Sequence, residues 1–154
     1  MSPIPAQEDF LFPIDALKDA KDKIQTANNW QEKYRQIMLM GKLLPSLNSQ
    51  FHTDEAQVRG CESKAWLYHT RLDNRHYFLA DSDARIVKGL AALLLAQCQG
   101  ASGDQLRNFD ASAYFQALGL EGQLSPSRTN GLMALVTQMQ AAADSDEQDN
   151  AGSQ

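Results

Sequence analysis

The chain has 154 residues, of which 43% are hydrophobic, and this is enough to bury one core, so we expect a single globular domain. The formal net charge is −5, and no basic field is present that would attract nucleic acid. Four acids and no base lie in the last eleven residues, so the rest of the chain is nearly neutral.

Membrane insertion and secretion are both unexpected. The first ten residues contain no Lys or Arg, which argues against a secretory signal. The longest apolar run, Leu90 to Ala96, is far too short to span a bilayer. Two cysteines without a signal peptide predict free thiols and a cytoplasmic location.

The N-terminal part predicts two helices behind an irregular lead-in. Prolines at positions 3, 5 and 13 favour irregular structure over residues 1–13. Apolar side chains at helical spacing then predict a helix over 14–27. Asn29 is a suitable N-cap for a second helix over 30–44, which Pro45 ends. We interpret the Met and aromatic stripe of this helix as part of the core.

A β-hairpin is predicted in the middle of the chain. Residues 65–72 alternate between two sets of side chains, Asp73-Asn74 is a turn signal, and residues 75–80 predict the returning strand. The sequence Asp-Ser-Asp at 81–83 then suits the start of a helix over 84–98, with Gly100 just beyond its end. We expect this apolar helix to be buried against the sheet.

Three further helices complete the expected fold. Two short ones are predicted over 102–108 and 112–118, and Ser125-Pro126 begins a last helix that ends at about Ala143. The acidic residues 144–154 predict a disordered tail. The sequence therefore predicts one α+β domain over residues 14–143, with a small antiparallel sheet flanked by helices.

The two cysteines have different surroundings. Cys98 lies on the apolar stripe of a hydrophobic helix, so we expect a buried thiol with a raised pKa. Cys61 follows Gly60 in a loop before a strand, where Arg59 and Lys64 favour the thiolate and Glu62 opposes it. These residues alone leave Cys61 open to two interpretations, a half-buried structural residue or a reactive thiol.

Three separated stretches in order, VRGCESKAW, DSDARIVKGL and LSPSRTNGL, together with the helix EKYRQIMLMGKLLP, resemble the SufE/CsdE family of sulfur-acceptor proteins. The resemblance covers about Trp30 to Ala143 and implies an α+β fold similar to that of iron–sulfur scaffold proteins. It also implies that Cys61 is the acceptor cysteine, which takes sulfane sulfur as a persulfide from a cysteine desulfurase and stimulates that enzyme. The sulfur would then pass to a downstream acceptor or scaffold protein for iron–sulfur cluster assembly or a related pathway.

The resemblance also implies which partner and site residues to expect. The desulfurase, which is SufS-like or CsdA-like, binds the pyridoxal phosphate, so this chain needs no cofactor or metal of its own. Gly60, Glu62 and Arg128 are expected to bind the partner. Arg128 is a cation in the first turn of a helix, where the dipole disfavours it. We also expect Cys61 to rest against apolar neighbours in the free protein and to move outward on docking.

Other interpretations remain open at this stage. The lead-in before Trp30 and the stretch WLYHT favour the CsdE-like branch, whereas DSDARIVKG and LSPSR suit SufE equally well. A cysteine-dependent hydrolase or peroxidase would use Cys61 with His52, His69 or His76 as its base. A metal site or cluster scaffold is disfavoured because there is no CxxC or HxxxH spacing. A binding module without chemistry and a homodimer are both compatible with the sequence.

Overall fold

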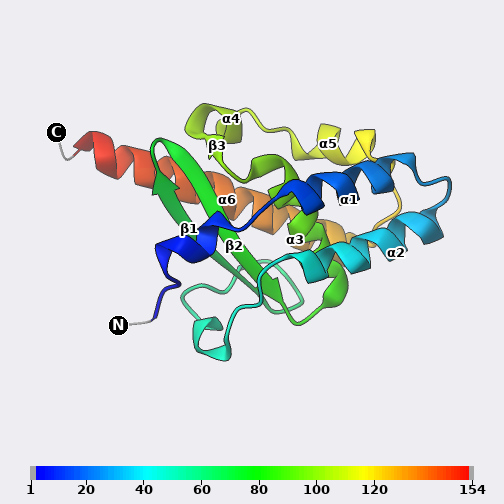
Figure 1. Ribbon diagram of the computed structural model, residues 1–154, viewed down its shortest axis with the longest axis horizontal. Coiled ribbons are helices and arrows are strands. Elements are labelled where there is room, and N and C mark those ends of the chain that lie inside the picture. The colour runs from blue at the N-terminus through cyan, green and yellow to red at the C-terminus, as the bar shows by residue number, and fades with distance from the viewer. Residues whose placement is uncertain (1–2, 153–154) are drawn as a thin grey trace.

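The computed structural model describes the backbone of residues 3–152 and the side chains of residues 3–145. Helices surround a small antiparallel sheet, which confirms the predicted α+β class (Figure 1). The elements, with η for a 3-10 helix, are η1 (Gln7–Leu11), α1 (Asp15–Thr26), α2 (Trp30–Met40), η2 (Gly41–Leu43), η3 (Ser49–Phe51), β1 (Ala65–Leu72), β2 (Arg75–Ser82), α3 (Arg85–Cys98), β3 (Ala101–Ser102), α4 (Gly103–Arg107), α5 (Ala111–Ala117) and α6 (Pro126–Gly152).

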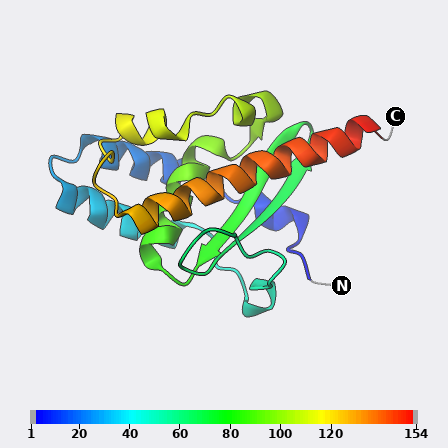
Figure 2. The same cartoon turned by 180° about the vertical axis from the view of Figure 1, so that it is seen from behind.

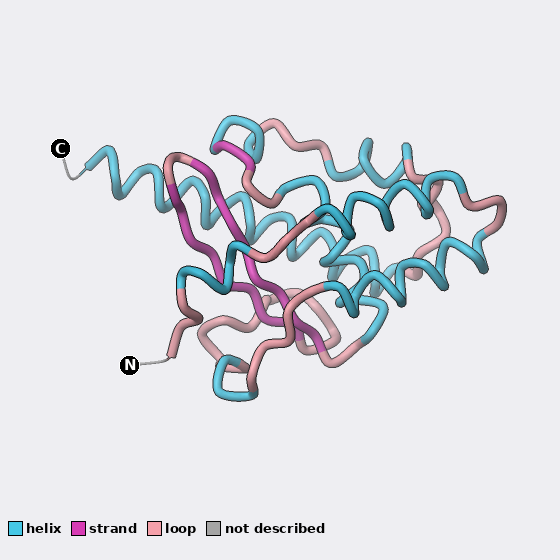
Figure 3. Tube along the Cα trace, in the orientation of Figure 1, coloured by secondary structure: helices cyan, strands magenta, loops and turns pink. Residues whose placement is uncertain are grey.

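The predicted hairpin makes up most of the sheet, whose strand order is β1-β2-β3, and Figure 3 shows its strands lying among the helices. β1 and β2 pair along their full length, from Ala65 opposite Ser82 to Leu72 opposite Arg75. Asp73 and Asn74 in the turn have φ angles of 52° and 65°, as the twist of a two-residue hairpin turn requires. β3 pairs with the start of β2 and is a third strand that the sequence did not predict.

The main core lies between the hairpin and the helices on one face. Alternate strand residues such as Leu67 and Phe78 are buried there against α3, whose side chains are almost all buried, as predicted. α6 crosses the hairpin on this side and contacts β1 (Figure 2). Within residues 3–152, no helix is both long enough and apolar enough to cross a membrane.

The lead-in covers the opposite face of the hairpin and contains the short helix η1. Phe10 forms a second buried cluster there with Leu47 and Leu79. The Gln99 amide donates hydrogen bonds to the carbonyl oxygens of Phe10 (2.9 Å) and Phe78 (3.1 Å) and accepts one from the Phe78 N–H (2.8 Å). The side chain of Gln99 thus continues the backbone pairing of β2 beyond the end of β3.

Helices α2 and α3 approach each other very closely. A Cβ atom at Gly89 would lie 2.1 Å from the carbonyl oxygen of Ile37, so only glycine fits at this crossing. Just beyond this contact α2 ends at Met40 and the chain continues as η2, whereas the sequence predicted one helix to residue 44. The close crossing fixes α3 against the rest of the core.

The structure corrects the predicted start of α3. Asp81 and Ser82 are the last residues of β2, and α3 begins at Arg85 with Ala84 as its N-cap and no side-chain cap. The Ser82 hydroxyl accepts a hydrogen bond from the Ala84 N–H instead (3.1 Å). The polar residues of this segment therefore serve the end of the strand, and the first turn of α3 contains no acid.

The last helix is longer than predicted. α6 runs for 27 residues to Gly152, so the segment from residue 144, predicted to be a disordered tail, is helical up to that point; residues 153–154 lie outside the described part. No Pro or Gly interrupts the sequence between Gly131 and Gly152, and the many Ala and Gln residues favour a helix. An ion pair between Arg107 and Asp144 (3.3 Å) joins α4 to this part of α6.

Candidate functional site

Cys61 lies near the tip of a short loop that is closed at its base. The Val58 N–H donates a hydrogen bond to the Ala65 carbonyl oxygen (2.8 Å), which brings the two ends of the loop together. The Lys64 carbonyl oxygen accepts bonds from the Ser82 hydroxyl (2.7 Å) and the Asp83 N–H (3.0 Å). These contacts fix the base and leave residues 59–63 to carry the thiol.

The sulfur of Cys61 rests directly on helix α6. A Cβ atom at Gly131 would lie 2.8 Å from Cys61 Sγ, well inside normal contact distance, so the space that the sulfur occupies exists only because residue 131 is glycine. Cys61 is half-buried at this seat and packs against the main core. Its reactive atom is thus held by shape, on a helix that is itself part of the core.

The two neighbours of Cys61 meet the same face of α6. A side chain at Gly60, whose φ is +87°, would contact the methyl group of Ala134 at 3.6 Å. Glu62 Oε2 accepts a hydrogen bond from the Ser127 hydroxyl (2.7 Å). Ser127, Gly131 and Ala134 have the spacing i, i+4, i+7, so they share one helix face. We call these three small residues the floor of the site.

A cavity of ≈ 460 Å³ opens beside the thiol. It is lined by Asp54, Gln57, Val58, Arg59, Gly60 and Cys61. Residues 57–61 of the loop therefore border open space on this side. The Cys61 loop is thus bordered both by helix α6, on which the sulfur rests, and by this cavity.

Arg128 lies in the same turn of α6 as Ser127 but faces another way. Its guanidinium carbon is 6.0 Å from the centre of the Tyr34 ring, so the cation lies over an aromatic face of α2. The contact with Tyr34 offsets the unfavourable position of a cation in the first turn of a helix. The structure therefore places Gly60 and Glu62 on the floor beside Cys61, whereas the Arg128 side chain lies over Tyr34 of α2 and has no contact with the Cys61 loop among the interactions of the described residues.

The three histidines considered as bases have partners elsewhere. His52 Nε2 lies 2.7 Å from Asp81 Oδ2, and His69 Nε2 lies 2.8 Å from His76 Nδ1. Across the described residues, no hydrogen bond joins Cys61 to a histidine. This arrangement gives no support to a hydrolase or peroxidase that uses a Cys–His pair.

Cys98 is buried on α3, as predicted, with 2% of its surface exposed. Burial raises the pKa of its thiol to about 12. At neutral pH Cys98 is therefore a protonated, buried thiol, and Cys61 is the cysteine that reagents or partners can reach.

The floor of the site was not predicted. Gly131 lies in the stretch LSPSRTNGL, which by itself does not indicate a contact with Cys61. The usable signal was a glycine inside a helix, where it lowers stability by about 1 kcal/mol relative to alanine and therefore needs a reason. Close approach of another part of the chain is such a reason, and here the approaching group is Cys61.

Residues 18–143 match the family described as SufE: Fe-S metabolism associated domain. The chain is 40% identical to the Sulfur acceptor protein CsdE of Escherichia coli (strain K12) over 114 residues, which are 73% of this chain and 78% of that protein. An uncharacterized SufE-like protein of Rhizobium etli is 38% identical over 120 residues, covering 75% of this chain and 81% of that protein. A solution structure of a hypothetical protein from Thermus thermophilus has the same fold, with a TM-score of 0.67, 18% identity, and coverage of 84% of this chain and 93% of that one. With the family match spanning most of the chain and identities near 40%, the chain belongs to the SufE/CsdE family.

Proposed function

We propose that this protein is a sulfur acceptor that carries sulfane sulfur as a persulfide on Cys61. The observation that carries the proposal is the half-buried Cys61, which sits on a loop closed at its base and rests over Gly131. The sulfur would come from a pyridoxal-phosphate-dependent cysteine desulfurase, which this protein stimulates. The likeness to a relative named as a sulfur acceptor supports this assignment.

The transfer requires one thiol and no further catalytic group on this chain. The Cys61 thiolate attacks the outer sulfur of the persulfide on the desulfurase, and a new sulfur–sulfur bond forms at Cys61. The sulfur–sulfur bond on the desulfurase breaks, and its cysteine leaves as a thiolate that takes up a proton. The transfer needs no external oxidant or reductant, because the sulfane sulfur only moves from one cysteine to another.

The position of Cys61 suits a carrier that must both protect and deliver its cargo. In the described conformation the sulfur is held against the glycine of the floor, which limits its contact with unrelated thiols and oxidants. Delivery to a recessed site requires the tip of the loop to move away from α6. We propose that docking draws residues 59–63 outward, and that Gly60, Glu62 and Arg128 contact the desulfurase during this step.

The proposal continues to the next carrier. The persulfide on Cys61 would pass its outer sulfur to the thiol of a downstream acceptor or scaffold protein by the same exchange, for iron–sulfur cluster assembly or a related pathway. We place this sequence of transfers in the cytoplasm, where reducing conditions keep both cysteines free.

Intact-mass analysis tests the proposal. The protein is incubated with L-cysteine and a purified desulfurase. One set of samples contains a SufS-like enzyme and another set contains a CsdA-like enzyme. We expect a gain of one sulfur atom on the wild type and on Cys98→Ser and no gain on Cys61→Ser. The desulfurase should be faster with the wild type or Cys98→Ser, but not with Cys61→Ser. If no desulfurase adds sulfur to Cys61, or if Cys61→Ser stimulates the enzyme fully, the proposal is wrong.

A further inference from the structure

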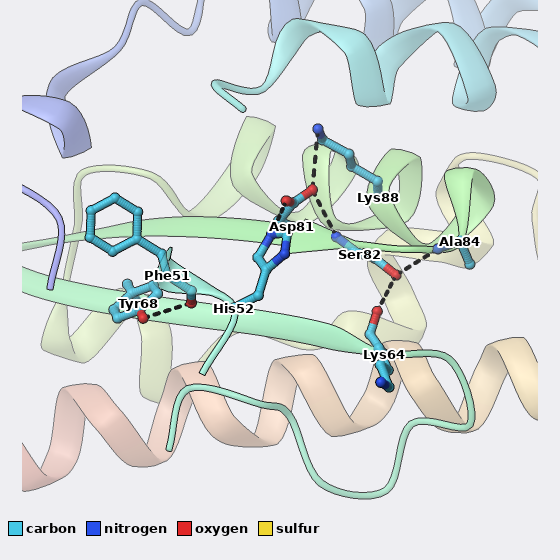
Figure 4. A network of polar contacts seen from close by, with 8 residues as sticks. All are labelled: Phe51, His52, Lys64, Tyr68, Asp81, Ser82, Ala84 and Lys88. Atoms are coloured by element: carbon cyan, nitrogen blue, oxygen red, sulfur yellow. Dashed lines mark hydrogen bonds and ion pairs between the residues drawn. The ribbon is translucent and has the colours of Figure 1, made fainter. Parts of the chain in front are cut away.

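The carboxylate of Asp81, near the end of β2, is the centre of a polar network beside the Cys61 loop (Figure 4). One oxygen lies 2.7 Å from His52 Nε2, and the other accepts a hydrogen bond from the Ser82 N–H (2.9 Å) and forms an ion pair with Lys88 Nζ (3.2 Å). The Asp81 side chain is only 11% exposed. Contacts of this kind to a partly buried carboxylate are stronger than those between neutral groups.

The first consequence of this network is that the start of the stretch 52–64 is fixed. The His52 ring stacks on Trp66 of β1, with the ring centres 3.9 Å apart and the planes 10° from parallel. The Tyr68 hydroxyl donates a hydrogen bond to the carbonyl oxygen of Phe51 (2.8 Å), one residue earlier. The chain is therefore held against the outer face of the hairpin where the stretch begins.

The second consequence is that the end of the same stretch is fixed by the next residue of β2. The Ser82 hydroxyl donates to the Lys64 carbonyl oxygen (2.7 Å) and accepts from the Ala84 N–H (3.1 Å). Ser82 is itself oriented by its N–H bond to the Asp81 carboxylate. Two adjacent residues of one strand thus hold the two ends of the stretch that carries Cys61.

We propose that Asp81 and Ser82 form a clasp that positions the Cys61 loop for sulfur transfer. The proposal rests on the proposed function of Cys61 and adds two positioning residues to it. The clasp restricts movement to the tip of the loop, so the desulfurase meets a loop that is already ordered. A partner that binds an unclasped loop has to order it during docking, which weakens binding.

The clasp predicts a specific kinetic pattern. Removing it should raise the concentration of this protein that half-saturates the desulfurase, because ordering is then a part of binding. The saturated rate should stay within about twofold of the wild type, since the attacking thiol and its partner are unchanged once docked. Replacing a residue with a purely structural role would lower the free energy of unfolding and leave the half-saturating concentration unchanged.

The test compares Asp81→Ala, Ser82→Ala and His52→Ala with two controls. Ser82→Thr keeps the hydroxyl, and Tyr114→Phe removes a buried hydrogen bond to the Leu93 carbonyl oxygen (2.6 Å) on the other side of α3. Each protein is first checked for folding and for the rate at which iodoacetamide alkylates Cys61. We expect the three Ala variants to be alkylated at least about threefold faster than the wild type, and both controls to match it.

Desulfurase assays over a range of concentrations of each variant complete the test. We expect the half-saturating concentration to rise about fivefold in Asp81→Ala, Ser82→Ala and His52→Ala and to stay at the wild-type value in Ser82→Thr and Tyr114→Phe. If the Asp81→Ala chain does not fold, Ser82→Ala and His52→Ala decide the matter.

The clasp is refuted if the wild type is loaded with sulfur and the folded Ala variants match it in alkylation and in half-saturating concentration. Failure of the proposed function gives a different result, because the wild type itself then gains no sulfur. The two ideas therefore fail in distinguishable ways.

Discussion

Replacing Gly131 with alanine should expel Cys61 from its seat on α6. The added methyl group would lie 2.8 Å from Cys61 Sγ, whereas ordinary contacts to a Cβ begin at 3.4 Å, so the sulfur has to retreat by at least the difference. Overpacking of this kind destabilises the seated conformer by about 1–3 kcal/mol. Alanine in place of glycine inside a helix stabilises the folded protein by about 1 kcal/mol, which opposes this loss. The free energy of unfolding should therefore fall by no more than about 2 kcal/mol.

Alkylation of Cys61 by iodoacetamide measures the displacement. Destabilising the seated conformer by about 1 kcal/mol shifts the balance toward the displaced one by about fivefold, and the alkylation rate should rise at least that much if only displaced thiols react. Urea unfolding provides the stability of the same sample. The matched control is Asn130→Ala, which raises helix propensity at an exposed position next to Gly131.

The refuting result is clear for this substitution. If Gly131→Ala is more stable than the wild type by about 1 kcal/mol and its Cys61 is alkylated at the wild-type rate, the methyl group fits without displacing the sulfur. The seat would then not exist as described. Slower alkylation would also contradict it, because the thiol would have become better protected.

Three other predictions follow from single contacts. Gly89→Ala places a methyl group 2.1 Å from the Ile37 carbonyl oxygen, so urea unfolding should show a loss of about 3 kcal/mol or more; a loss smaller than about 1 kcal/mol would mean that α2 and α3 separate easily. Burial raises the pKa of the Cys98 thiol from 9.0 to about 12. The contribution of the buried thiol to the free energy of unfolding is therefore complete below pH 9, and it is lost at up to ~1.4 kcal/mol per pH unit as pH rises toward 12. Cys98→Ala should show a shallower loss of unfolding free energy over this range, and equal slopes would refute the assignment. Arg128→Ala removes a contact with Tyr34 worth about 0.5–1 kcal/mol, so the free energy of unfolding should fall by no more than this amount. Stimulation of the desulfurase by the folded variant should nevertheless be weaker than that by the wild type, and unchanged stimulation would exclude Arg128 from the docking surface.

The hairpin could be predicted because its signals are local. Alternation of side chains from Ala65 to Leu72 and the Asp73-Asn74 turn each depend on a few neighbouring residues, and the observed register follows from them. β3 has only two residues, and the Gln99 side chain that extends its pairing acts through tertiary contacts with Phe10 and Phe78. No period or turn signal in the sequence marks contacts of this kind.

The end of α6 is hard to predict because acidity and helix propensity point to different structures there. Acidic residues after Asp144 suggested a solvated tail, but the same segment lacks any helix breaker before Gly152 and continues a helix that is already formed. Extending an existing helix requires no new nucleation, so weak propensity is enough.

The candidate site was predictable only in its outer parts. The stretches that carry Cys61, Gly60, Glu62 and Arg128 could be picked out from the sequence, but the pairing of Cys61 with Gly131 depends on how the loop folds onto α6. His52 was considered as a base for Cys61 chemistry, and the structure shows it bonded to Asp81 instead.

Parts of both outer edges of the hairpin are covered by other segments of the chain, and this bears on how the Cys61 loop can move. Gln57 pairs with Trp66 along the outer edge of β1, and the Ala56 carbonyl oxygen and the Val58 N–H complete that short ladder. On the other side, β3 and Gln99 occupy the edge of β2. An unpaired strand edge recruits other chains. Movement of the loop that broke the Val58–Ala65 hydrogen bond would expose such an edge at the start of β1, whereas movement confined to residues 59–63 keeps it covered.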